Sequence, residues 1–322
     1  MIRLLVVLIF CGGITIGLLY GAANDTWPES SSLGCMNQST ILFITALVAY
    51  GVNWIVFVPA AIAQTEKYYD FTGSVTYFSA TIISLLLGAG VSCSDVGVSF
   101  HPRAVLQSFF VLIWCVRLGS FLFARIKKDG KDGRFDEIKI NPPRFLGAWT
   151  IQGAWVFFTA LPVFLVNSSG SDKAICANDV IGWLVWAFGF AIEVIADNQK
   201  GAFAANPANK GKYINEGLWY YSRHPNYFGE MTLWFGQFIA ATAVMEGSQY
   251  CTIFSPFFVI FLLMKVSGVP MLEKRGEEKF KGDTGYALYV LNTSCIIPLP
   301  KGTKTEVPQE KLLQEQTQVN TV

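Results

Sequence analysis

Long runs of apolar residues recur along the chain and constrain its fold more than any other feature. The runs cover residues 4–23, 41–63, 75–92, 104–124, 145–166, 180–196, 228–245 and 250–264. Most of them approach the roughly 20 residues that an α-helix needs to cross about 30 Å of hydrocarbon. Only helices and closed barrels satisfy all backbone polar groups inside a bilayer. The sequence therefore predicts an all-α membrane bundle of about eight transmembrane segments, of which the last two form a short hairpin or a full pair.

The overall composition agrees with a membrane protein. Of the 322 residues, 52% are hydrophobic and only 15% are charged, with a net charge of +1, whereas soluble domains carry about 25% charged residues. No basic stripe is interleaved with aromatic residues, so no nucleic-acid partner is expected. The two histidines, His101 and His224, are too few to suggest a histidine-based metal site. No obligate protein partner is indicated.

Basic residues divide the loops into two classes. Of the 24 Lys and Arg residues, only Arg103 and Lys173 fall in the loops on one side. Because loops rich in Lys and Arg stay in the cytosol, both termini and the loop 125–144 are predicted to be cytosolic. Residues 1–23 are either a retained helix, which we favour, or a cleaved signal peptide.

The domain organisation follows from these runs. Residues 1–40 are expected to form the first transmembrane helix, or signal anchor, with an outer loop. Residues 41–300 are expected to form one transmembrane domain. Residues 301–322 are polar and Gln-rich, which is typical of a disordered tail.

The predicted outer side carries signals for modification. Glycosylation sequons lie at Asn24, Asn37 and Asn167, and modification is expected on that side only. A fourth sequon, at Asn292, is predicted to be cytosolic and unmodified. The outer side also permits disulfides, although the sequence does not choose among pairings. The cysteines concerned are Cys35, Cys93, Cys176 and Cys251.

The densest polar cluster lies between residues 217 and 230. It holds Arg223, His224, Asn226 and Glu230 within eight residues, directly before an apolar run. Charge at membrane depth is costly unless it is paired or lines a site, so this cluster is the leading candidate for chemistry. The alternative is an interfacial anchor with Arg223 extended toward the headgroups. The aromatic residues of that anchor are Trp219, Tyr220, Tyr221 and Tyr227.

A second cluster closes the run that begins at residue 180. Glu193, Asp197 and Lys200 are spaced i, i+4 and i+7, so they share one helical face. The spacing alone fits two interpretations equally well. The charged side chains either pair with one another, or they form a site for a polar ligand. Arg117 lies well inside an apolar run, where a charged side chain is a functional candidate. Arg125 follows two turns later.

Two cytosolic turns carry weaker signals. The basic loop 125–144 is explained mainly by orientation, although Arg134 beside Phe135 is a candidate for bidentate contact with phosphate. Asp70, followed by Thr72 and Gly73, indicates helix capping and turn formation rather than a site.

Five pieces of the chain together resemble a known superfamily. They are residues 64–73, residues 117–135, Asp197-x-x-Lys200-x-x-Phe203, residues 217–230 and residues 265–298. They resemble the membrane reductases that include the steroid 5α-reductases and the sterol Δ14- and Δ7-reductases, and within that superfamily the DUF1295 family. The resemblance covers about residues 40–300.

The resemblance implies an NADPH pocket in the C-terminal half, about residues 180–300, that faces the cytosol, in a protein of the endoplasmic reticulum membrane. In relatives, the residues corresponding to Asp197, Asn226 and Glu230 contact the nicotinamide or ribose, and basic residues hold the phosphates. The full set of expected cofactor-binding residues is Arg117, Arg125, Arg134, Glu193, Asp197, Lys200, Trp219, Arg223, His224, Asn226, Tyr227 and Glu230.

The implied reaction is hydride transfer to a C=C bond of a lipid or sterol-like substrate, assisted by an acid. Steroid-reducing members use a Tyr–Glu pair, but Arg117 and Leu118 occupy the corresponding positions of the fourth run, so the catalytic residues stay unassigned. The isoprenylcysteine carboxyl methyltransferases share the Arg-His-Pro-x-Tyr-x-Gly motif and bind S-adenosylmethionine. Glu277-Glu278 resembles their C-terminal Glu pair. A non-catalytic lipid-binding relative is the third alternative.

Overall fold

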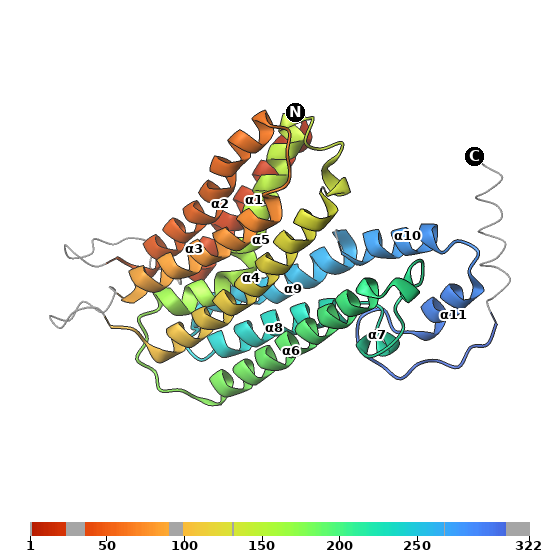
Figure 1. Cartoon of the computed structure of the whole chain (residues 1–322). Helices are drawn as coiled ribbons and strands as arrows, with labels where there is room; N and C mark the ends of the chain where they lie inside the picture. Colours follow the sequence, from red (N-terminus) through yellow and green to blue (C-terminus); the bar gives the residue numbers. More distant parts are fainter. Residues whose placement is uncertain (1, 24–35, 90–98, 131, 267, 307–322) are drawn as a thin grey trace. The chain divides into compact units, whose positions relative to one another are not determined.

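The computed structural model describes residues 2–23, 36–89, 99–130, 132–266 and 268–306, and this part of the chain is helical (Figure 1). Seven of its helical stretches are long and apolar enough to cross a membrane. The prediction of a polytopic helical membrane protein is therefore confirmed. The orientation of the termini stays a prediction.

The first six predicted apolar runs correspond to the first six α-helices. Most of these helices extend beyond the apolar run, because polar residues continue the helical turns at their ends. Their bounds are α1 Ile2–Ala22, α2 Gln38–Ile62, α3 Tyr69–Ala89, α4 Pro102–Asp129, α5 Pro142–Ser168 and α6 Ala177–Ala205.

The last two predicted runs differ from a simple hairpin. Helix α8, Pro225–Ala241, has 17 residues and is not among the seven candidate spans. After η3, Gly247–Ile253, the chain continues through α9, Phe254–Phe261, and the π-helical turn η4, Leu262–Val266, toward α10, Val269–Lys279. The predicted apolar run ends near residue 264 because the residues that follow are charged and lower the mean hydropathy. The remaining elements are η1 Gly133–Phe135, η2 Pro207–Asn209, α7 Leu218–Tyr221 and α11 Thr284–Asn292.

The chain divides into two compact units. Unit 1 contains Met1–Leu184 and Trp234–Phe258, and unit 2 contains Val185–Leu233 and Val259–Val322. In unit 1, α5 is the central helix and contacts α1, α2, α3 and α4. Nearly all of its residues after Phe145 are buried, which explains why it is apolar on every side.

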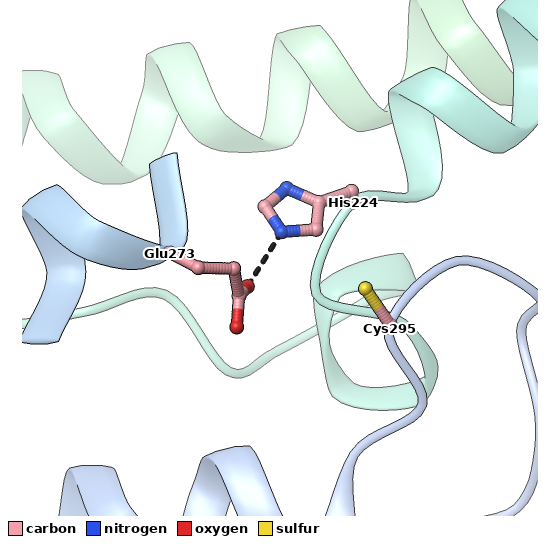
Figure 2. A group of neighbouring side chains, drawn as sticks. All are labelled: His224, Glu273 and Cys295. Carbon is pink, nitrogen blue, oxygen red and sulfur yellow. Dashed lines mark hydrogen bonds and ion pairs between the residues drawn. The ribbon is translucent and has the colours of Figure 1, made fainter. Parts of the chain in front are cut away.

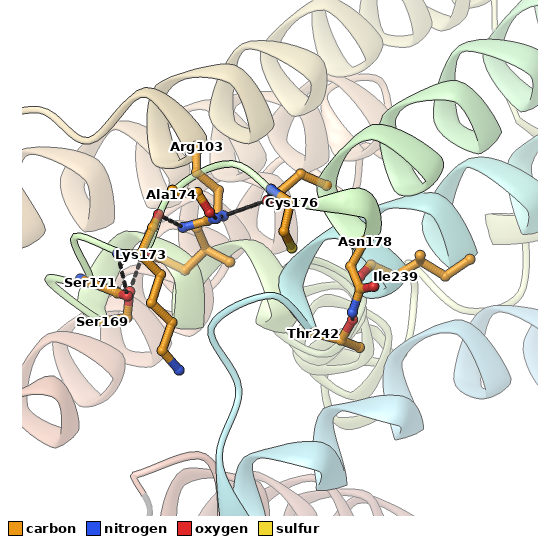
Figure 3. Close-up of polar contacts among 11 residues, drawn as sticks. Arg103, Ser169, Ser171, Lys173, Ala174, Cys176, Asn178, Ile239 and Thr242 are labelled. Carbon is orange, nitrogen blue, oxygen red and sulfur yellow. Dashed lines mark hydrogen bonds and ion pairs between the residues drawn. The ribbon is translucent and has the colours of Figure 1, made fainter.

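One end of unit 1 is held by a buried ion pair, and Figure 3 shows its arginine, Arg103, beside Lys173 and Ala174. Arg103 in the first turn of α4 donates two hydrogen bonds to Asp179 of α6, at 2.6 and 2.8 Å. Arg103 also donates to the carbonyl oxygens of Lys173 and Ala174. Both charged side chains are almost fully buried. The pair therefore fixes the loop between α5 and α6 against α4.

The predicted cytosolic turns of unit 1 are held by a second set of ion pairs. Buried Glu66 accepts from Lys139 Nζ at 2.8 Å and from the backbone N–H of Asp132 at 3.1 Å. Arg134 donates to Asp132 and lies 3.6 Å from Asp70. The loop between α4 and α5 is thus fastened to the turn between α2 and α3.

The glycosylation sites predicted on the outer side differ in their burial. Asn167 is buried, and its Nδ2 donates to Ser84 and Ser108 at 2.9 and 3.0 Å. The structure contradicts glycosylation at Asn167, because the atom that would carry the glycan is inside the fold. Asn37 is half-buried, caps α2 and stays a predicted acceptor, while Asn24 lies outside the described residues.

The cysteines of the predicted outer side do not reveal a pairing. Cys176 and Cys251 are both free thiols in the part of the chain that the structure describes. Cys35 and Cys93 lie outside the described residues.

Unit 2 is organised by a close approach of α6 and α8. A Cβ atom at Gly229 would lie 2.6 Å from the carbonyl oxygen of Gly189 and 2.6 Å from the amide nitrogen of Glu193. Only glycine permits this backbone contact. The C-terminal segment then pairs with the end of α7, where Ser222 and Ser294 form an isolated parallel bridge.

The predicted tail begins at residue 301, but its first residues make contacts. Lys301 Nζ lies 4.7 Å from the centre of the Tyr220 ring, and Lys304 N donates to Asn292 Oδ1 at 2.7 Å. Residues 307–322 lie outside the described part of the chain.

Candidate functional site

Unit 2 contains a cavity of about 400 Å³. This volume lies within the range of about 300–1,000 Å³ that is usual for ligand pockets. The wall comes from the end of α6, the loop before α7, and helices α10 and α11. Its residues fall into a basic group, Lys200, Lys210, Lys212, Arg223 and Lys279, and an aromatic group, Phe203, Tyr213, Trp219, Phe280, Tyr286 and Tyr289.

Four of the aromatic rings form a connected cluster. The ring centre of Tyr213 lies 5.4 Å from Phe280 and 5.2 Å from each of Tyr286 and Tyr289. Burial raises the pKa of Tyr213, Tyr286 and Tyr289 above the ordinary value, so these phenols are neutral at pH 7. The cluster offers a rigid apolar surface on which a planar ring system can pack.

Lysine side chains surround this aromatic cluster. Lys200 Nζ lies 4.8 Å from the centre of the Trp219 ring, and Lys279 Nζ lies 4.9 Å from that of Phe280. Lys210 and Lys212 are exposed on the loop that closes the cavity, and neither forms an ion pair with an acid in the described residues. The lining therefore carries more positive charge than its one acid, Glu273, balances.

Glu273 links Arg223 and His224, the two central residues of the sequence motif, and its contact with His224 is drawn in Figure 2. Its Oε1 lies 2.6 Å from His224 Nε2, and its Oε2 lies 3.0 Å from Arg223 Nη2. His224 is held further by its backbone N–H, which donates to Ser222 Oγ at 3.1 Å. Sequence analysis missed Glu273, because 49 residues separate it from His224.

The predicted role of Arg223 as a phosphate ligand does not fit this geometry. Its Nε and Nη2 pair with Glu273, and its Nη1 donates to the carbonyl oxygens of Val290 and Thr293. All three guanidinium nitrogens are therefore engaged inside the protein. Arg223 joins α10 and α11 to the motif and positions the cavity wall.

His224, Glu273 and Cys295 bring together three types of metal ligand. One donor atom from each lies within 4.8 Å of the others. However, His224 and Glu273 are within hydrogen-bonding distance of each other, and Arg223 already neutralises the carboxylate. A metal ion would have to displace this guanidinium charge. We therefore interpret the group as an ion-pair network that shapes the cavity.

The predicted cofactor residues of unit 2 fall into two groups. Lys200, Trp219, Arg223 and His224 line the cavity. The remaining residues lie on the facing turns of α6 and α8, where buried Asp197 accepts from Asn226 Nδ2 at 3.2 Å. The other members of this second group are Glu193, Tyr227 and Glu230. Glu193 is buried, and the ring of Tyr227 stacks on that of His224.

Trp219 shows how the motif is fixed in place. Its side chain is buried, and its Nε1 donates to the carbonyl oxygen of Ala196 at 2.9 Å. The backbone N–H of Leu218 donates to Gln199 Oε1 at 2.9 Å, which satisfies the first turn of α7. The interfacial-anchor interpretation does not fit Trp219, because an anchor would be exposed to the headgroups.

The other three predicted cofactor residues belong to unit 1. Arg134 Nε and Nη2 both donate to Asp132 Oδ2, so the prediction of a phosphate contact is not supported there. Arg117 is half-buried, with its guanidinium carbon 5.9 Å from the centre of the Phe121 ring. Arg125 lies near the end of α4, and its side chain is outside the described part.

Two known proteins are similar to parts of this chain. A "Probable O-methyltransferase ustE" from Ustilaginoidea virens is 35% identical over 102 residues, which cover 27% of this chain and 36% of the relative. An "Uncharacterized protein C594.04c" from Schizosaccharomyces pombe is 22% identical over 180 residues, covering 48% of this chain and 52% of the relative. The chain thus spans about a third and about half of these two relatives. No solved structure matches.

The family model described as "Protein of unknown function (DUF1295)" matches residues 56–293. This range includes α3 to α11, the cavity of unit 2 and the network around Glu273. Because the match covers well over half of the sequence, the chain belongs to the DUF1295 family.

Proposed function

We propose that this protein is an integral-membrane oxidoreductase that uses NADPH to reduce a carbon–carbon double bond of a lipid or sterol-like substrate. The protein would reside in the endoplasmic reticulum membrane, with its cofactor cavity facing the cytosol. The observation that carries the proposal is the combination, in one cavity, of four lysines with a single carboxylate and a connected cluster of aromatic rings.

The charge of the lining suits a ligand with several phosphates. Lys200, Lys210, Lys212 and Lys279 all present ammonium groups around the cavity. Lysine binds phosphate as a point charge and needs no fixed fork geometry. Arg223 already balances the only carboxylate of the lining. The excess positive charge therefore favours NADPH over NADH, because NADPH carries one more phosphate.

The aromatic cluster provides the apolar part of the same site. Tyr213, Phe280 and Tyr286 form a neutral surface against which a base or nicotinamide ring can pack. When bound, the cofactor supplies a hydride. His224, held by Glu273, keeps its ring in one orientation at the wall. This arrangement accounts for why a buried histidine stands beside a mostly buried arginine in the motif.

A methyltransferase is the second candidate, and the printed name of the Ustilaginoidea virens relative favours it. S-adenosylmethionine carries a sulfonium cation and no phosphate, so it would gain little from the lysines. Glu277 and Glu278, the pair that resembles the methyltransferase motif, are exposed on α10 and outside the cavity lining. The charge of the cavity thus supports the reductase more strongly.

The proposal is tested by isothermal titration calorimetry, in which the detergent-purified full chain is titrated with NADPH, NADH and S-adenosylmethionine. The reductase predicts that NADPH binds with the highest affinity. Tighter binding of S-adenosylmethionine would favour the methyltransferase, and binding of none of the three would favour a non-catalytic lipid-binding protein. If NADPH binds, its oxidation in the presence of a 3-keto-4-ene sterol then tests the reaction.

A further inference from the structure

Helices α4 and α8 meet inside unit 1 through a polar residue and a tryptophan from each helix. Gln107 and Trp114 are two turns apart on α4, and Trp234 and Gln237 are one turn apart on α8, so each pair shares one face of its helix. The ring centres of Trp114 and Trp234 are 5.1 Å apart, and Gln237 Nε2 donates to the carbonyl oxygen of Gln107 at 3.3 Å. These contacts define one interface within unit 1.

Four polar side-chain atoms at this interface are buried without a hydrogen-bond partner among the residues that the structure describes. They are Nε2 and Oε1 of Gln107, Oε1 of Gln237 and Nε1 of Trp234. Each of the three side chains belongs to a residue that is at most 1% exposed. Taking such a group out of water without a replacement hydrogen bond is unfavourable. Four of these atoms at one interface therefore indicate a bound polar ligand.

An unpaired indole N–H alone does not indicate a ligand. Trp149 Nε1 is also buried without a partner in the described part of the chain, but Trp149 packs in a cluster whose other buried members are Ala60, Phe135 and Phe145. Those side chains are apolar and cannot help to bind a polar molecule. Trp234 differs because two glutamine side chains lie at the same interface.

The chemistry of the unpaired atoms selects the ligand. The N–H groups of Gln107 and Trp234 are donors, which disfavour a cation, and the carbonyl oxygens of Gln107 and Gln237 are acceptors, which disfavour an anion. A water molecule both donates and accepts, and buried waters in proteins typically use two to four such partners. Because α4 is long and apolar enough to cross a bilayer, hydrocarbon outside the helix cannot satisfy these atoms.

We propose that Gln107, Trp234 and Gln237 form a binding site for ordered water between α4 and α8. The water accepts from the indole and amide N–H groups and donates to the amide oxygens. It thereby adds hydrogen bonds to an interface at which Gln237 and Gln107 already make one. The proposal is independent of the reductase function, because the water is detected on the protein without a cofactor.

The first test detects the water directly. Rotating-frame Overhauser transfer from water to indole N–H groups is measured on the detergent-purified full chain with isotope-labelled tryptophan. The variants Trp234→Phe and Trp149→Phe assign the two signals. Transfer is expected at Trp234 and not at Trp149, which is the matched control because its N–H is equally unpaired but lies in an apolar cluster. No transfer at Trp234, or equal transfer at both residues, would overturn the proposal.

The second test uses the sign of a stability change. Gln107→Met keeps the length of the side chain and removes both unpaired atoms. If they bind water, the melting temperature should fall by about 2–4 °C, the usual effect of one lost hydrogen bond in a large domain. Gln152→Met calibrates the measurement, because Gln152 is also buried and its Nε2 donates to the carbonyl oxygen of Tyr69 at 2.8 Å. An unchanged or higher melting temperature for Gln107→Met, beside a lower one for Gln152→Met, would show that the amide binds nothing and would overturn the proposal.

Discussion

Glu273 Oε1 lies 2.6 Å from His224 Nε2, while the other carboxylate oxygen pairs with Arg223 at 3.0 Å. One carboxylate thus connects α10 to both central residues of the motif before α8. The neighbouring Arg223 is also bonded to carbonyl oxygens of α11 and the segment after it. The network gives the motif a positioning role in addition to its proximity to the cavity.

Replacing Glu273 with Gln should loosen unit 2. The change leaves the mostly buried guanidinium of Arg223 without its counter-charge, and we expect a loss of about 1–3 kcal/mol, as for a hydrogen bond to a charged group. Thermal unfolding of the purified variant measures the loss. Glu278→Gln is the control, because this carboxylate is 65% exposed and should have little effect. Equal stability of the two variants would contradict the role of Glu273.

The buried pair of Arg103 and Asp179 should contribute more to stability than an exposed pair nearby. Asp179→Asn leaves the buried Arg103 unpaired, which costs about 3–5 kcal/mol for a buried pair. Lys173 and Glu246 also form an ion pair, at 2.7 Å, but both side chains are at least half exposed, so Glu246→Gln should produce no measurable change. Comparison of the two melting temperatures tests the difference.

Glu66 should make unit 1 sensitive to acid. Burial raises the pKa of Glu66, but the hydrogen bonds from Lys139 and from the backbone of Asp132 outweigh it, so the pKa is lower than usual. A carboxyl group with a depressed folded pKa stabilises the fold above its unfolded pKa of about 4.3 and loses that contribution as the pH falls through the folded value.

The variant Glu66→Gln should therefore be less stable than the wild type at pH 7. The difference between the two melting temperatures should shrink as the pH is lowered below about 4, because the wild-type carboxylate becomes protonated. Glu137→Gln serves as a control on the exposed part of the same loop. A difference that stays constant down to the lowest pH at which the protein folds would refute the assignment.

Glycosylation distinguishes Asn37 from Asn167. Since Asn167 is buried and its amide nitrogen is engaged, Asn167→Gln should leave the electrophoretic mobility unchanged. Asn37→Gln should remove a shift that peptide-N-glycosidase abolishes in the wild type, if the outer orientation of this loop is correct. A glycan on Asn292 would instead reverse the predicted orientation.

The spanning helices were predictable because hydropathy is a local property of the sequence. Helices α1 to α6 follow the apolar runs, and their ends are polar turns that hydropathy does not detect. The eighth run ends at residue 264, close to the end of η4 at Val266, and the charged residues that follow belong to a separate helix, α10, which begins at Val269.

The site was less predictable, because its partners are distant in sequence. Arg223 was identified as a charged residue of interest, but the acid that engages it, Glu273, lies 50 residues away. Spacing along one helix revealed the shared face of Glu193 and Asp197, yet it gave no indication that Asn226 bonds to Asp197. Ion pairs between distant segments are set by the packing of helices, which the pattern of one segment does not contain.

The most direct test of the cofactor assignment is the affinity for NADPH of the wild type and of Lys210→Ala/Lys212→Ala, measured by isothermal titration. Lys274→Ala is the control, because Lys274 is 78% exposed on α10 and outside the cavity lining. We predict that the wild type and the control bind NADPH equally. The double variant should lose about 1–3 kcal/mol, as expected for charged hydrogen bonds to phosphate. No binding of NADPH to the wild type, or equal binding by all three proteins, would contradict the account.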